Sequence, residues 1–114
     1  MDEKWYVATV LMQCRVAGDQ IGPWTCDEQV HVLRAHDDKT AYQKALRIGQ
    51  NAEHSYQNTY GETVTWEFVG LVQLDELMDE SIEDGTEITS RLFSHTDPSS
   101  LVIHDENALR EHRT

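Results

Sequence analysis

Residues 4–16 read KWYVATVLMQCRV, and apolar side chains recur at every second position along this stretch. A period of two is typical of a strand with one face buried, because successive side chains of an extended chain point to opposite sides. One face of this strand would carry Tyr6, Ala8, Val10, Met12, Cys14 and Val16. The stretch therefore predicts a long, half-buried strand against which the other elements must pack.

A second extended segment follows the first after a loop. Residues 17–23 contain two glycines and a proline, a composition that predicts a loop. Residues 24–35 then return to an extended pattern. The two segments are therefore predicted to form an antiparallel hairpin about a loop centred near Gln20.

The hairpin also predicts how the two strands align. Residue i pairs with residue 40 − i, which sets Val10 opposite Val30. The same register sets Cys14 opposite Cys26, and this raises the alternative of a redox pair. A free cysteine in an apolar stripe behaves as a small hydrophobic side chain, and cytoplasmic thiols stay reduced. We therefore favour packing over redox chemistry for the cysteines.

Residues 37–56 change to a helical period, with small and apolar residues at spacings of three and four. These positions are Ala41, Ala45, Ile48, Ala52 and Tyr56. Asp37 or Asp38 is suited to cap the first turn, because its carboxylate can accept hydrogen bonds from the exposed amides there. The alanines would let the helix lie close to a sheet, and the helix is expected to end before a turn at residues 58–61.

The second half of the chain contains two more extended segments. Residues 62–74 alternate again and predict a strand. Residues 75–83 are predicted to form a short acidic helix. Asp84-Gly85 is a turn signal, and it leads into a last predicted strand over residues 86–93.

These elements predict a single α+β domain over residues 1–93, followed by a C-terminal tail over residues 94–114 with a short helix from Asp105 to His112. Their order is β-β-α-β-β, which gives a four-stranded, mainly antiparallel sheet with one main helix packed on one face. The second face also carries apolar residues, namely Trp5, Val7, Leu11, Val69 and Leu71. One helix covers only one face, so we predict a homodimer in which a second copy supplies the cover.

Negative charge is concentrated in one part of the chain. The sequence has 21 acids and 9 bases, a net charge of −12 with histidine neutral. The 43 residues between Arg47 and Arg91 hold ten of the acids and no Lys or Arg. The densest part contains Asp75, Glu76, Asp79, Glu80, Glu83, Asp84 and Glu87. This stretch is either a solvated face or a steering surface for a basic protein partner.

The charge and the apolar runs also bear on partners and location. Nucleic acid and anionic membranes are disfavoured as partners, because both are bound by basic surfaces. Residues 1–4 lead directly into the first strand without an apolar signal core, and no apolar run is long enough to span a bilayer. The expected location is therefore the cytoplasm.

Sequence motifs for catalysis or cofactor binding are missing. The six histidines and two cysteines form no HExxH or CxxC pattern, so no metal site is predicted. No serine lies in a GxSxG turn, and no glycine-rich loop precedes a helix. The sequence therefore predicts no catalytic residues and no cofactor.

Five stretches of the chain resemble the bacterial domain of unknown function 4288 family. They are Lys4–Ala8, Ala41–Ala45, Asn58–Glu62, Trp66–Gly70 and Asp84–Glu87. The resemblance covers residues 4–93 and implies the fold and the order of its elements, but the family brings no established activity. It nominates the polar residues Asn58, Glu62 and Glu87 as binding residues.

Three functional hypotheses follow. The first is a non-enzymatic, homodimeric binding or interaction module, suggested by the apolar residues on both sheet faces. The second is an acidic inhibitor or immunity-type protein that masks a basic protein target. The third is a small-ligand binder or enzyme with a pocket formed by Asn58, Glu62 and Glu87.

Overall fold

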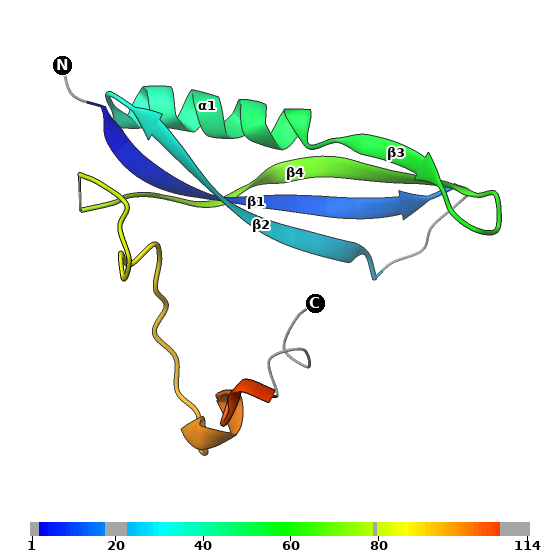
Figure 1. Cartoon of the computed structure of the whole chain (residues 1–114). Coiled ribbons are helices and arrows are strands. Elements are labelled where there is room, and N and C mark those ends of the chain that lie inside the picture. Colours follow the sequence, from blue (N-terminus) through cyan, green and yellow to red (C-terminus); the bar gives the residue numbers. More distant parts are fainter. Residues whose placement is uncertain (1–2, 18–22, 79, 108–114) are drawn as a thin grey trace.

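A four-stranded antiparallel sheet with one helix on one face forms the domain (Figure 1). The computed structural model describes residues 3–17, 23–78 and 80–107. The elements are β1 (Lys4–Val16), β2 (Thr25–Ala35), α1 (Asp38–Asn51), β3 (His54–Gln57), β4 (Thr63–Glu76) and a 3₁₀ helix, η1 (Pro98–Leu101). The strand order across the sheet is β2-β1-β4-β3. The predicted α+β class and the β-β-α-β-β order are confirmed.

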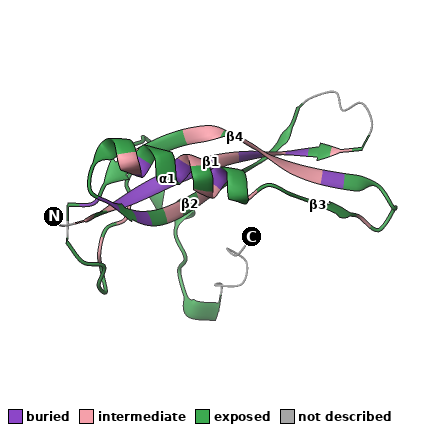
Figure 2. Ribbon diagram, turned by 90° about the horizontal axis from the view of Figure 1, so that it is seen from above, coloured by how far each residue is buried: buried purple, intermediate pink, exposed green. Residues whose placement is uncertain are grey.

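β1 lies inside the sheet and supplies most of its buried side chains (Figure 2). The predicted face is buried at Tyr6, Ala8, Val10, Met12 and Cys14. Val7 and Thr9, on the opposite face, are buried as well. Both faces of β1 are therefore buried between Tyr6 and Val10, and β2 and β4 pair with its two edges along nearly its whole length.

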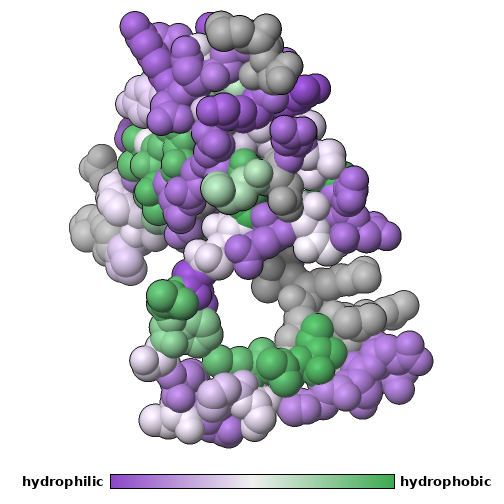
Figure 3. Space-filling view, turned by 90° about the vertical axis from the view of Figure 1, so that its left-hand side faces the viewer, coloured by the Kyte–Doolittle hydropathy of each residue, from purple (hydrophilic) through white to green (hydrophobic). Residues whose placement is uncertain are grey.

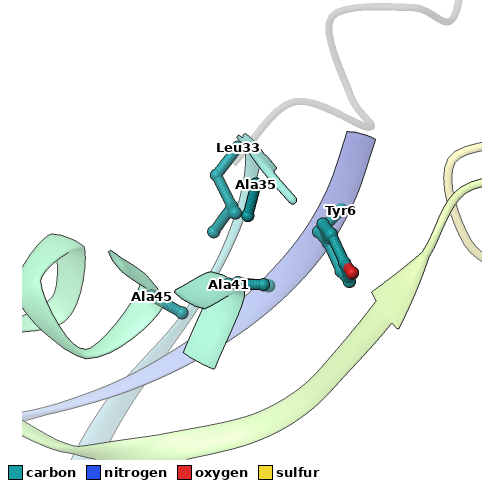
Figure 4. Packing of buried hydrophobic residues seen from close by; sticks show 6 residues of the cluster. Tyr6, Leu33, Ala35, Ala41 and Ala45 are labelled. Atoms are coloured by element: carbon teal, nitrogen blue, oxygen red, sulfur yellow. The ribbon is translucent and has the colours of Figure 1, made fainter. Parts of the chain in front are cut away.

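α1 packs on the sheet through small side chains. Asp37 caps the helix, and its Oδ1 accepts a hydrogen bond from the Thr40 amide at 2.8 Å. The core cluster joins β1, β2 and α1 through Tyr6, Ala8, Leu33, Ala35, Ala41 and Ala45, whose side chains converge between the helix and the sheet (Figure 4). The alanines bring the helix axis close to the strands, as the sequence predicts.

The fourth strand is not the predicted one. Residues 86–93 contain no strand; the fourth strand is β3, which follows α1 directly and pairs with the start of β4. α1 ends at Asn51, so Tyr56 belongs to β3 and not to the helix. A short chain reversal at residues 58–62 brings β3 beside β4 immediately. The later segment, by contrast, would have to reach an edge of the sheet from a distance.

The predicted acidic helix over residues 75–83 is also wrong. β4 continues to Glu76, and the Leu77 amide donates to the Trp5 carbonyl at 2.8 Å, which extends the pairing with β1. Among the described residues after Glu76 there is no α-helix, and η1 is a 3₁₀ helix. The predicted helix from Asp105 to His112 and the hairpin loop near Gln20 lie largely outside the described residues.

The alignment of β1 with β2 differs from the prediction by one residue. Val10 lies opposite Gln29, and Cys14 lies opposite Thr25. A shift of one residue moves a strand's side chains to the other face, so Cys14 is buried whereas Cys26 is exposed. In the observed register Leu33 packs under α1. The predicted register would have turned the Leu33 side chain away from the helix.

Two irregularities in β4 change which of its residues face the helix. The pairing of β1 with β4 shifts between Thr9 and Val10 and again between Leu11 and Met12. The first shift brings Leu71 opposite Val10, and Leu71 packs against the core. The prediction that Leu71 lies on the open face is therefore wrong, because each bulge inserts one residue and reverses the alternation.

The chain beyond β4 leaves the sheet. η1 lies well below the strands in Figure 1, and the large apolar side chains in it and on either side of it are exposed (Figure 3). They are Leu92, Phe93, Leu101, Val102 and Ile103. The Arg91 guanidinium lies 4.9 Å from the centre of the Phe93 ring. The described part of the tail therefore leaves the exposed residues of β2 uncovered.

Candidate functional site

Asn58 and Glu62 form the turn between β3 and β4. The Asn58 Oδ1 accepts hydrogen bonds from the amides of Tyr60, at 2.9 Å, and Glu62, at 3.0 Å. The Asn58 Nδ2 donates to the Glu62 carboxylate at 3.2 Å, and Gly61 adopts a φ of 79°. The side chain of Asn58 thus acts as a template for the chain reversal.

Replacing Asn58 by alanine is expected to destabilise the fold by about 1–2 kcal/mol, because two amides of the turn lose their acceptor. Asn58→Asp keeps an acceptor oxygen and should lose less. Thr59→Ala, in the same turn, is the matched control, with an expected change within about 0.5 kcal/mol. Urea denaturation measures all three. Equal stability of Asn58→Ala and Thr59→Ala would contradict the template role.

Glu87 lies at the other end of β4. It lines a cavity of about 530 Å³ together with Gln73, Asp75, Glu76, Leu77, Met78, Ile88, Thr89 and Ser90. Glu62, by contrast, directly precedes the first residue of β4. The structure therefore brings two of the three nominated residues together and separates the third from them.

The acidic stretch after β4 is an exposed, irregular segment. Glu80, Glu83 and Asp84 are exposed, while Asp79 lies outside the described residues. The Glu83 amide donates to the Thr86 Oγ1 at 2.8 Å, and Gly85 has a φ of 87°, which confirms the predicted turn. Its carboxylates are thus displayed to solvent at one end of the sheet.

A basic concavity of about 280 Å³ lies between α1 and β2. Its lining contains Glu3, Leu33, Arg34, Lys44, Arg47, Ile48 and Asn51. The Lys44 Nζ donates to the Arg34 carbonyl at 2.6 Å and lies 3.8 Å from the Glu3 carboxylate. Lys44 therefore connects the helix to the edge of the sheet, a structural use of this cation.

The sheet face opposite α1 exposes apolar side chains on β2. Val30 and Val32 are 53% and 45% exposed, and they lie opposite Thr9 and Val7 of β1. The Arg34 guanidinium lies 5.3 Å from the centre of the Trp5 ring on the same face. The open face thus combines two valines with a cation–π pair at the outer strand of the sheet.

Among the described strands β2 lies at an edge of the sheet, because β1 is the one strand that pairs with it. The Trp5 carbonyl accepts from Leu77, on the β4 side, so the opposing Arg34 does not exchange hydrogen bonds with it. The bond from Lys44 to the Arg34 carbonyl agrees, because it shows that this carbonyl points outward. The register of β1 with β2 has no bulge, so the backbone groups of Glu28, Val30 and Val32 also point outward.

The other open edge is protected. β3 pairs with β4 only as far as Trp66, and beyond it the amide of Phe68 donates to the Glu53 carboxylate at 3.0 Å. The two bulges then follow along β4. Bulges and capping side chains are common devices against pairing at a sheet edge. Among the described strands, β2 is thus the long edge that remains regular.

Metal-ligating groups do not cluster in the part of the chain that the structure describes, where no three of the His, Cys, Asp and Glu side chains could hold one ion. Within the same residues, no helix has the length and hydropathy needed to cross a membrane.

Comparison with known proteins identifies the family. The family model described as "Domain of unknown function (DUF4288)" matches residues 5–90, which span all four strands and α1. The chain belongs to this family. No curated protein and no solved structure matches the chain.

Among the described residues of the DUF4288 domain, Tyr6 has a strongly shifted pKa. Burial raises the pKa of the Tyr6 hydroxyl to about 12, and its hydrogen bond to the Asp38 carboxylate, at 2.9 Å, acts in the same direction. The hydroxyl joins β1 to the first turn of α1. The bond is partly buried and joins the buried ring of Tyr6 to an exposed carboxylate, so Tyr6 stabilises the contact between β1 and α1.

Tyr6 should make the stability of the DUF4288 domain depend on pH in the alkaline range. Its pKa is higher in the folded state than in the unfolded chain, so its contribution is complete below pH 10 and is lost between pH 10 and about 12. Urea denaturation across this range measures the loss. Tyr6→Phe should flatten this dependence, and an unchanged slope would contradict the assignment.

The edge of β2 is a candidate binding surface that the sequence motifs did not predict. Glu28, Val30, Val32 and Arg34 alternate along one face, and this pattern is visible in the sequence. Their position at an edge depends on the strand order: among the described strands β2 pairs with β1 alone, and residues 86–93 form no strand beside it.

Proposed function

We propose that this DUF4288 protein is a homodimeric binding or interaction module of the bacterial cytoplasm rather than an enzyme. The observation that supports it is the pair of half-exposed valines, Val30 and Val32, on an open sheet face beside an unpaired edge. Exposed apolar residues next to free backbone groups favour association with another chain.

Light scattering coupled to size-exclusion chromatography tests the dimer. At micromolar concentration the expected mass is twice the 13.1 kDa of one chain. A mass of one chain across the micromolar range would overturn the proposal. Dilution into the nanomolar range gives the dissociation constant of the wild-type dimer, against which variants are compared.

The exposed acidic stretch supports a second candidate function, an inhibitor that masks a basic protein. Glu80, Glu83 and Asp84 are displayed without an ion pair among the described residues. Electrostatic steering predicts that association with such a partner slows steeply as salt rises. Reversal of the charges at these positions and at Asp79 should abolish binding, and unchanged binding would remove this candidate.

A further inference from the structure

We propose that two copies of the chain pair through β2, antiparallel about a two-fold axis at His31. Glu28 then lies opposite the partner's Arg34, and Val30 lies opposite the partner's Val32. The result is one continuous sheet made of two four-stranded halves. This inference rests on the proposed homodimer and specifies which surface forms it.

The backbone limits the registers that such a pair can adopt. The outward groups belong to alternate residues, which include Glu28, Val30, Val32 and Arg34. Within the described residues the outward groups of the first three have no partner, since β1 is the one strand that pairs with β2. An antiparallel ladder forms only when outward residues face outward residues, so the axis must pass through a residue of β2 and not between two.

The side chains then select one register. With the axis at Val30, Glu28 would face a valine of the partner. With the axis at Val32, Val30 would face an arginine. With the axis at His31, each valine faces a valine and each glutamate faces an arginine, on the same face of the sheet. This register alone among the three matches both apolar and charged positions.

The two charged residues are placed for this contact. Glu28 and Arg34 are both exposed, and neither is in an ion pair with another described residue. The stacking of Arg34 on Trp5 holds the guanidinium on the face that also carries the valines. The bond from Lys44 to the Arg34 carbonyl leaves that oxygen a second lone pair for the amide of the partner's Glu28.

The choice of a second copy as the occupant follows from self-complementarity. β2 carries two acids and one base, so its net charge is −1. The 43 residues between Arg47 and Arg91, by contrast, hold ten acids and no base. The strand thus lies in the nearly neutral part of an acidic protein. A strand that pairs apolar with apolar and acid with base when set against itself needs no other partner.

Charge exchange within the full-length chain tests the register. Glu28→Arg alone should face arginine with arginine, and Arg34→Glu alone should face glutamate with glutamate. Each variant is expected to dimerise at least about tenfold more weakly than the wild type. An equimolar mixture should restore pairing as a heterodimer, because each contact then joins opposite charges. Lys39→Glu, an exposed change on α1, is the charge-matched control for Arg34→Glu.

Sedimentation and native mass spectrometry read out the outcome. Heterodimers in the mixture, together with a wild-type-like control, are the expected result. If the wild type dimerises, and Glu28→Arg, Arg34→Glu and their mixture dimerise as well as the wild type, the β2 register is wrong and the homodimer stands. If the wild type is a monomer, the homodimer and the register both fail. Circular dichroism confirms that each variant is folded.

Discussion

Gly49→Val should unfold the domain or cost it at least about 3 kcal/mol, the upper range for overpacking of a core. Gly49 is buried on the sheet side of α1, and a β-carbon at this position would overlap the Phe68 ring of β4. A valine adds two methyl groups to that overlap. Either the Phe68 ring must shift, or α1 must move away from the sheet and lose part of the alanine contacts of the core.

Gly49→Ala separates this steric effect from helix propensity. In an open helix the change from glycine to alanine stabilises by about 1 kcal/mol. Here the added carbon meets the Phe68 ring, and we expect a loss of about 1–3 kcal/mol instead. The sign of the change therefore shows which effect dominates. Gln50→Ala, at the exposed neighbouring position of α1, is the matched control.

Denaturation in urea, followed by circular dichroism, measures the free energy of unfolding of each variant. Phe68→Leu should recover part of the loss in the Gly49→Ala background, since the smaller side chain relieves the overlap. A stabilised Gly49→Ala protein would show that α1 lies further from β4 than the structure has it.

Val30→Asp combined with Val32→Asp is expected to weaken dimerisation by at least about 100-fold. In the proposed register the two changes bring four carboxylates together at the centre of the interface. Both valines are about half exposed in the single chain, so the monomer should remain folded. Size-exclusion chromatography with light scattering measures the dimer, and circular dichroism the fold.

The control for this variant is Val69→Asp combined with Val72→Asp. These valines are 53% and 54% exposed, almost the same as Val30 and Val32, but they lie at the bulges of β4. The β2 register predicts that the control remains a dimer. If the control dissociates as readily as the β2 variant, the contact extends over β4 and the edge pairing is wrong.

Alternation and helical spacing were sufficient to predict β1, β2, α1 and the start of β4. The one-residue error between β1 and β2 arose because apolar residues occur on both faces of the hairpin. Val30 can lie opposite Val10 or Thr9, and both registers leave a similar pattern of apolar pairs across the two strands. The choice depends on the helix, which buries Leu33 and Ala35 but leaves Val32 open.

The errors in the second half of the chain have local causes. β3 has four residues, too few for a clear period, and Tyr56 also fits the helical spacing of α1. The only signal in the sequence for the bulges of β4 is Gly70, because a glycine inside a strand often marks a bulge. Residues 86–93 alternate well enough to predict a strand, yet in the structure they do not pair with either edge of the sheet.

The candidate site was predictable only in part. The resemblance to DUF4288 drew attention to Asn58 and Glu62, and the structure assigns both to one turn. The β2 edge could not be predicted from pattern alone, because a strand becomes an edge through the placement of its neighbours. Once the order β2-β1-β4-β3 is known, the alternation of Glu28, Val30, Val32 and Arg34 becomes informative.

Hydrogen exchange at the backbone amides of β2 reports directly on whether two chains pair through this strand. The amides of Gln29, His31 and Leu33 point toward β1 and should be protected at every protein concentration. If the chains pair through β2, the outward amides of Glu28, Val30 and Val32 are protected in the dimer and exchange rapidly once dilution dissociates it. Rapid exchange of these three amides in a protein that is fully dimeric would contradict pairing through β2.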